Sequence, residues 1–241
     1  MKRILWAGAI ALVAGGQALA ADLPPPVAPR APATYVPTTV PVYNWSGIYI
    51  GANGGYAFGT SSWNDPTGVL AFPPGAIATG NFNTNGGLAG GTIGANYQWG
   101  GAVLGVEGDW DWSNLNGTSN IIGCGPGCET KANWLSTVRG RAGWAFDRVL
   151  LYGTGGAAFA PVQAGFNGGP FQSSTQVGWT AGAGVEFAFA PNWTAKAEYL
   201  YADLGSFTCN TNCFAGPATP LTVKLTDNIV RAGINFKFNP W

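Results

Sequence analysis

The sequence of 241 residues contains no histidine. Histidine is the side chain that serves most often as a general base and as a metal ligand near neutral pH. Membrane-embedded lipases, acyltransferases and proteases that depend on an active-site histidine are therefore excluded. Neither a Gly-x-Ser-x-Gly elbow nor a Walker phosphate-binding motif is present. We expect a protein that is not an enzyme and that uses no cofactor.

Charged residues and long apolar runs are also scarce. Asp, Glu, Lys and Arg make up 9% of the chain, against roughly 25% in soluble domains. No segment after the N-terminal region approaches the ~20 consecutive apolar residues of a membrane helix. The formal net charge is +0, which gives no electrostatic reason to expect nucleic acid as a partner.

Glycine and aromatic residues are abundant instead, with 38 Gly, 11 Trp, 8 Tyr and 13 Phe. A chain with few charges, many aromatics and no helical span fits two classes of protein. One is a soluble glycine-rich β protein. The other is a membrane barrel, whose hydrophobicity alternates residue by residue.

The N-terminal segment has the three parts of an export signal. Lys2 and Arg3 supply positive charge, a short apolar stretch follows, and Ala18-Leu19-Ala20 offers the small residues that a signal peptidase accepts. We expect residues 1–20 to be a signal peptide. Residues 21–42 contain seven prolines, which predicts an extended periplasmic linker. The folded domain then spans 43–241.

Alternation with period two predicts eight strands in this domain. The expected ranges are 45–58, 86–99, 102–114, 132–146, 148–160, 175–189, 193–205 and 223–238. The connections alternate between long ones at 59–85, 115–131, 161–174 and 206–222 and tight turns at 100–101, 147–148 and 190–192. This pattern predicts an all-β fold, an eight-stranded antiparallel up-and-down transmembrane β-barrel with its long loops outside the cell.

Strand parity separates charged from apolar positions. One face of each strand is uncharged, and the other carries most of the charges, which we place inside a barrel too narrow for an open channel. We expect balanced, paired charges there, because an unpaired buried charge is costly. The turn at 190–192 sets Glu186 opposite Lys196, and we expect these two to form an ion pair. The predicted interior set is Glu107, Asp109, Asp111, Arg139, Arg141, Glu186, Lys196, Glu198, Arg231 and Lys237.

Tryptophans near the strand ends are typical of the aromatic girdles at the two membrane interfaces. The candidates are Trp45, Trp99, Trp112, Trp134, Trp144 and Trp193.

The four cysteines form two pairs with three residues between the members, Cys124 with Cys128 and Cys209 with Cys213. Exported chains meet an oxidising compartment, so disulfides are the leading interpretation, either within each loop or between the two loops. A zinc site built from all four thiolates is the alternative, and it requires both loops to converge.

Four stretches resemble a known family. They are YNWSGIYIGANGGY (43–56), VEGDW (106–110), VRGRAGW (138–144) and NIVRAGINFKF (228–238). They are similar to the alphaproteobacterial outer-membrane β-barrel proteins, the RopB-like small surface proteins related to the OmpA transmembrane domain. The resemblance implies a structural, surface-exposed protein of the outer membrane, and some relatives are linked to haem binding or adhesion.

The expected partners follow from that location. They are outer-membrane lipid and lipopolysaccharide, the barrel-assembly machinery during insertion, and, in one alternative, an extracellular ligand or host surface bound through the loops. The other alternative is a narrow diffusion pore. Which aromatic residue ends the insertion signal, Phe238 or Trp241, stays open.

Overall fold

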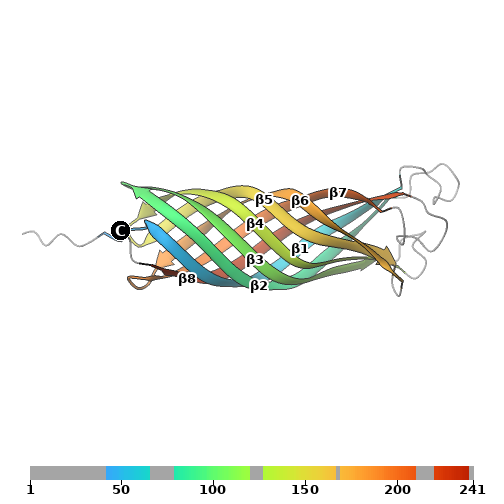
Figure 1. Ribbon diagram of the computed structural model, residues 1–241, viewed down its shortest axis with the longest axis horizontal. Helices are drawn as coiled ribbons and strands as arrows, with labels where there is room; N and C mark the ends of the chain where they lie inside the picture. The colour runs from blue at the N-terminus through green and yellow to red at the C-terminus, as the bar shows by residue number, and fades with distance from the viewer. Residues whose placement is uncertain (1–41, 66–78, 120–126, 167–168, 210–219, 239–241) are drawn as a thin grey trace, which may run out of the picture. The chain divides into compact units, whose positions relative to one another are not determined.

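The computed structural model describes residues 42–65, 79–119, 127–166, 169–209 and 220–238. The expected signal peptide, nearly all of the linker, and residues 239–241 lie outside this part. The described residues form one closed barrel in which each strand pairs with the next and β8 pairs with β1 (Figure 1). Its strands are β1 (Gly47–Asn64), β2 (Thr79–Trp99), β3 (Ala102–Ser119), β4 (Cys128–Phe146), β5 (Val149–Phe166), β6 (Phe171–Ala188), β7 (Trp193–Cys209) and β8 (Leu221–Lys237).

All eight ladders are antiparallel. The predicted eight-stranded up-and-down barrel is therefore confirmed, and so are the tight turns. These turns lie at 100–101, 147–148 and 189–192, and we call their side of the barrel the turn end. The opposite side, where the other four connections lie, is the loop end. Among the described residues, no helix has the length and apolarity needed to cross a bilayer.

The strands reach further toward the loop end than the sequence predicted. β1 ends at Asn64 rather than at residue 58, and β2 begins at Thr79 rather than at residue 86. The expected long connection at 161–174 shrinks to residues 167–170. With 17 to 21 residues each, the strands exceed the ~9–11 residues that cross a bilayer.

The outward face changes from apolar to polar along each strand. On β1 the outward residues between Ile48 and Phe58 are either large and apolar or small. Toward the loop end they are followed by the polar residues Thr60, Ser62 and Asn64. Ile48 to Phe58 covers a height of about 25 Å at the usual strand tilt, which is the height of a lipid-facing band. We call this band the belt, and the polar wall beyond it the collar.

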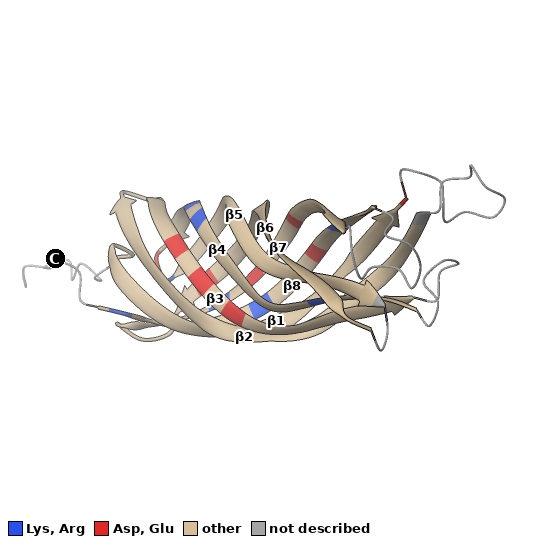
Figure 2. Ribbon diagram, turned by 45° about the vertical axis from the view of Figure 1, so that its right-hand side comes forward, with Lys and Arg blue, Asp and Glu red and all other residues tan. Residues whose placement is uncertain are grey.

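The inward face changes in the opposite sense. Inside the belt the buried side chains are mainly charged, and Figure 2 marks the acids and bases along the strands. Inside the collar they are mainly apolar, as with Val162, Leu204 and Leu225. The collar is thus built like a soluble barrel, polar outside and apolar inside. This reversal explains the extra strand length, because the Asn-, Ser- and Thr-rich stretches that look like loops are the water-facing positions of continuing strands.

Glycines on the inner wall make room for large inward rings. A Cβ at Gly94 would lie 2.3 Å from the hydroxyl oxygen of Tyr49, and a Cβ at Gly184 would lie 2.6 Å from that of Tyr152. Each tyrosine hydroxyl therefore lies against a glycine of the neighbouring strand, and from there it reaches the charged centre.

One ladder is shorter than the others. β6 pairs with β7 only from Trp179 opposite Asp203 to Ala188 opposite Thr194, although β6 remains paired with β5 as far as Phe171. β7 bulges at Asp203–Ser206, where Gly205 has a φ of 70°. In the collar, the two strands therefore run without a common ladder over residues 171–178 of β6.

Candidate functional site: the barrel interior

Glu107 on β3 lies at the centre of the interior and binds four groups from three other strands. Arg139 approaches its carboxylate at 2.5 Å and Lys196 at 3.0 Å, from β4 and β7. The hydroxyl of Tyr49 donates to the same carboxylate at 2.8 Å, and Arg141 lies at 3.4 Å. The Glu107 side chain is 1% exposed, so these four groups replace the water that an ionised carboxylate requires.

Two arginines link the remaining acids across the lumen. Arg139 contacts Asp109 and Glu198, each at 2.8 Å. Arg231 contacts Asp109 at 3.0 Å, Asp111 at 2.9 Å and Glu198 at 2.8 Å. Because both guanidinium groups bridge acids from β3 and β7, they tie opposite walls of the barrel together. We call this set of buried, ion-paired side chains the charge network.

Glu186 joins the network through a partner that the sequence did not predict. It lies opposite Lys196 in the ladder, so the predicted register is confirmed. Its carboxylate, however, accepts from Arg141 at 2.6 Å, Thr194 at 2.5 Å and Asn235 at 2.9 Å. Lys196 extends to Glu107 instead, so the expected Glu186–Lys196 ion pair is wrong. Strand parity places both side chains inside, but it leaves open which way a long side chain turns.

Lys237 lies apart from the network, at the turn end. Its ammonium group donates to the backbone carbonyl of Asn44 and lies 4.1 Å from the ring centre of Tyr43. Lys237 is 5% exposed, so its predicted inward position is confirmed, but its expected pairing with the interior acids is wrong. Burial raises the pKa of the Tyr43 hydroxyl to about 12, and the negative charge of Glu186 acts in the same direction.

The residues before β1 close the turn end. Trp45 is 1% exposed and packs with Val103, Leu150, Tyr152 and Ala188. Its indole nitrogen donates to the carbonyl of Asp147 at 3.0 Å, and its backbone nitrogen donates to Gln98 at 2.7 Å. Trp45 is therefore a plug and not the girdle residue that the sequence suggested.

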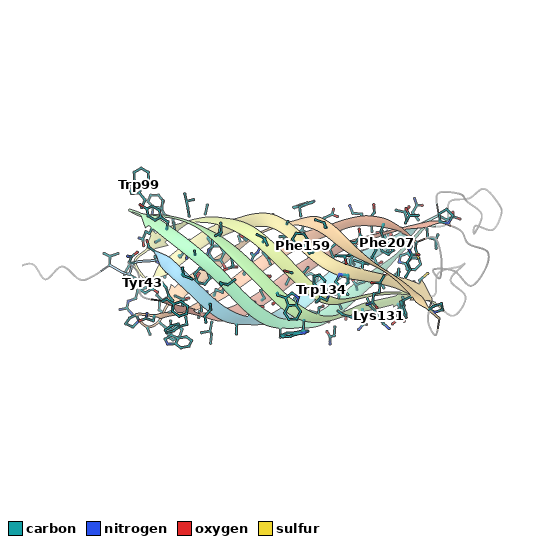
Figure 3. The ribbon with its side chains drawn as sticks, viewed as in Figure 1. Tyr43, Trp99, Lys131, Trp134, Phe159 and Phe207 are labelled. Carbon is teal, nitrogen blue, oxygen red and sulfur yellow. The ribbon has the colours of Figure 1, made fainter. Side chains whose placement is uncertain are left out.

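The other girdle candidates divide between two environments. Trp99, Trp112, Trp144 and Trp193 are exposed on the outer wall, and Figure 3 shows Trp99 pointing away from the wall at the turn end. Trp134 is only partly exposed.

Two buried acids, Asp65 and Asp227, were missed by the sequence reasoning. Asp227 on β8 is 4% exposed and accepts a hydrogen bond from Thr84 at 3.4 Å. It has the same parity as Arg231 and Asn235, so the alternation that located those residues was also the signal for Asp227. It lies on the loop-end side of the charge network.

Apolar layers fill the interior from the network to the loop end. One layer contains Leu88, Leu135, Leu200 and Ile229. A second contains Trp63, Phe82, Leu221 and Val223, with the buried sulfurs of Cys128 and Cys209. Both cysteines are disulfide-bonded, whereas Cys124 and Cys213 lie outside the described residues.

The interior is a core whose walls are held together by ion pairs. The network combines five acids (Glu107, Asp109, Asp111, Glu186, Glu198) with four bases (Arg139, Arg141, Lys196, Arg231). Within the described residues, no cluster of three or more His, Cys, Asp or Glu side chains has the arrangement of a metal site.

Comparisons with known proteins agree with this architecture. A family model described as the outer membrane protein beta-barrel domain matches residues 9–238. The chain is 36% identical over 252 residues to the 31 kDa outer-membrane immunogenic protein of Brucella melitensis, with 99% of this chain and 100% of that protein covered. It is 31% identical over 200 residues to the 22 kDa outer membrane protein of Rhizobium leguminosarum, with 82% and 80% covered.

Among solved structures, the outer membrane protein OprG of Pseudomonas aeruginosa gives a TM-score of 0.50 at 13% identity, covering 81% of this chain and 99% of that one. The outer membrane protease OmpT of Escherichia coli also gives 0.50, at 9% identity, covering 83% and 99%. At such low identity these two likenesses support the fold alone. The family model and the curated relatives decide the assignment: this chain belongs to the outer membrane protein β-barrel family and is a protein of the outer membrane.

Proposed function

We propose that the protein is a closed, non-catalytic barrel that displays four surface loops on a rigid wall and does not act as a diffusion pore. The observation that carries this proposal is the filled interior. The Trp45 plug, the charge network and the apolar layers follow one another from the turn end to the loop end.

A water-filled channel needs a continuous polar path, and the apolar layers interrupt one. Wide porins also have about twice as many strands. The interior therefore serves stability: buried ion pairs hold opposite walls together, and the apolar layers stabilise the collar by burying hydrophobic surface.

The polarity of the outer wall indicates how the barrel is oriented in the membrane. The polar collar must lie in water, beyond the bilayer. The tight turns, the start of β1 and the end of β8 all lie at the opposite side, so we place the loop end outside the cell. The relatives from Brucella are called immunogenic, which suits a protein whose loops face the exterior.

Electrical recording tests the closed interior. Mature protein, refolded into planar bilayers, should produce no discrete conductance steps. Boiled and unboiled samples should run differently on a gel, which ensures that a silent recording comes from folded protein. Reproducible conductance steps from the folded fraction would show that the protein forms a pore and would refute the closed interior.

Epitope insertion tests the display of loops. A short tag placed within residues 66–78 should be labelled by antibody on intact cells. The matched control carries the same tag between Asp147 and Arg148, at the turn end, and should be labelled only after the outer membrane is opened. Equal labelling of both, or labelling of the control alone, would refute the orientation.

A further inference from the structure

A groove lies on the outer wall where three neighbouring strands, β8, β1 and β2, run side by side. It has a volume of about 330 Å³, which is within the range of small-ligand sites. Its lining residues are Tyr56, Phe58, Gly59, Thr60, Asn83, Thr84, Asn85 and Asn228. None of these residues belongs to the Trp45 plug, the charge network or the apolar layers.

The lining combines aromatic faces with side-chain amides. Tyr56 is 52% exposed and Phe58 is 47% exposed. Phe58 lies between Asn85 on one side and Asn228 on the other in the two ladders. Within the described part of the chain, the amide groups of Asn83 and Asn85 form no hydrogen bond. The groove therefore offers flat apolar surfaces beside groups that both donate and accept.

Asn228 is held in a fixed orientation. Its side-chain oxygen accepts from the hydroxyl of Tyr199 at 2.6 Å, and its amide nitrogen donates to the carbonyl of Phe58 at 3.3 Å. A fixed amide at one edge of a groove loses little conformational entropy on binding a ligand.

The groove lies at the border between belt and collar. Tyr56 and Phe58 are the last large apolar outward residues of β1 before Thr60. On β8 the same border falls between Val230 and Asn228. Because the belt has the height of the hydrocarbon layer, the groove faces the headgroup level of the leaflet at the loop end.

The charge of the groove is zero, since none of its lining residues is ionisable apart from the phenol of Tyr56. The nearby outward base on β8, Lys224, lies 3.0 Å from Asp203 and is paired with it. A phosphate would find no unpaired cation among these groups. Sugar rings fit better, because their C–H faces pack on aromatic rings and their hydroxyls pair with amides.

We propose that this groove binds an uncharged sugar ring of the lipopolysaccharide that forms the outer leaflet around the barrel. The site would fix one lipid molecule to the β8–β1–β2 wall. The proposal goes beyond the display function; it rests on the proposed orientation with the loop end outside the cell, and it does not depend on whether the interior conducts.

Titration with purified lipopolysaccharide tests the proposal. The probe is added to the mature protein, refolded in phospholipid nanodiscs, and the dissociation constant is measured. Tyr56→Ala, and the double change Asn83→Ala with Asn85→Ala, should each weaken binding about tenfold, as expected for loss of one ring contact or two amide contacts. The matched controls are Tyr97→Ala and Asn133→Ala, which remove an exposed outward ring and an exposed outward amide elsewhere on the wall.

The controls should bind within about twofold of the unchanged protein, as surface substitutions away from a site usually do. All variants alter outward positions and should fold, which the gel shift on boiling verifies. A second titration with dephosphorylated lipopolysaccharide should preserve the tenfold difference. No binding by the unchanged protein, equal binding by groove and control variants, or a difference that disappears with the phosphates would each overturn the proposal.

Discussion

Replacing Glu186 by glutamine removes one charge from the interior and retains the shape of the side chain. The carboxylate is 3% exposed and accepts from Arg141 at 2.6 Å. After the change, Arg141 keeps Tyr49 at 2.9 Å and Glu107 at 3.4 Å. Removing one member of a buried ion pair costs about 3–5 kcal/mol. Because Arg141 is only partly deprived of partners, we expect a loss of about 3 kcal/mol in the free energy of unfolding.

A double-mutant cycle identifies the partner. Glu186→Gln combined with Arg141→Met should lose clearly less than the sum of the single changes, with a coupling energy of about 1.5–3 kcal/mol. The matched cycle uses Glu186→Gln with Lys196→Met, because Lys196 lies opposite Glu186 in the ladder but binds Glu107. That coupling should stay at about 0.5 kcal/mol, since the ion pair of Lys196 is with Glu107 and not with Glu186.

The assay is urea unfolding of the protein in lipid vesicles, followed by tryptophan fluorescence and by the gel shift on boiling. Refolding traces must coincide with unfolding traces so that the free energies are equilibrium values. A larger coupling of Glu186 to Lys196 than to Arg141 would show that the lysine turns toward Glu186, and the arrangement of the network described above would be wrong.

Three further outcomes are expected. Trp45→Ala should lower the free energy of unfolding by about 3–5 kcal/mol because it empties a buried plug, whereas the exposed Trp99→Ala should cost far less in the same urea assay; similar losses would contradict the plug. Mass spectrometry of unreduced protein treated with an alkylating reagent should find no free thiols, and four modified cysteines would contradict the disulfides. Amide hydrogens of residues 173–178 should exchange faster than those of residues 180–187, because only the latter have β7 as well as β5 in register; uniform protection along β6 would mean that the ladder is complete.

Much of the fold could be predicted from the alternation of apolar and polar residues, because successive side chains of a barrel strand point to opposite faces. The eight strands, their order and the tight turns follow from where the alternation starts and stops. The strand ends toward the loops could not be predicted in the same way. There the outward residues, such as Thr60 and Asn83, face water, and their composition matches that of ordinary loops.

The interior illustrates a second limit. Parity tells which side of the wall a side chain occupies, and for Glu107, Arg139 and Glu198 the structure places all three in the lumen. Which groups then meet depends on rotamers and on side chains that cross the lumen, as Arg139 does to reach Glu198. Trp45 shows a related limit, because a tryptophan just before a strand can face lipid or fold back into the barrel mouth.

The reversal of polarity along the wall is the central claim, since the membrane border, the filled interior and the sugar groove all depend on it. Solid-state NMR of the protein in bilayers, with magnetisation transferred either from lipid acyl chains or from water, measures it residue by residue. We predict fast transfer from acyl chains to the outward residues of β1 from Ile50 to Phe58, fast transfer from water to Thr60, Ser62 and Asn64, and slow transfer from water to buried Asp109. Fast water transfer to Asp109, or acyl-chain contact that continues to Asn64, would contradict the account.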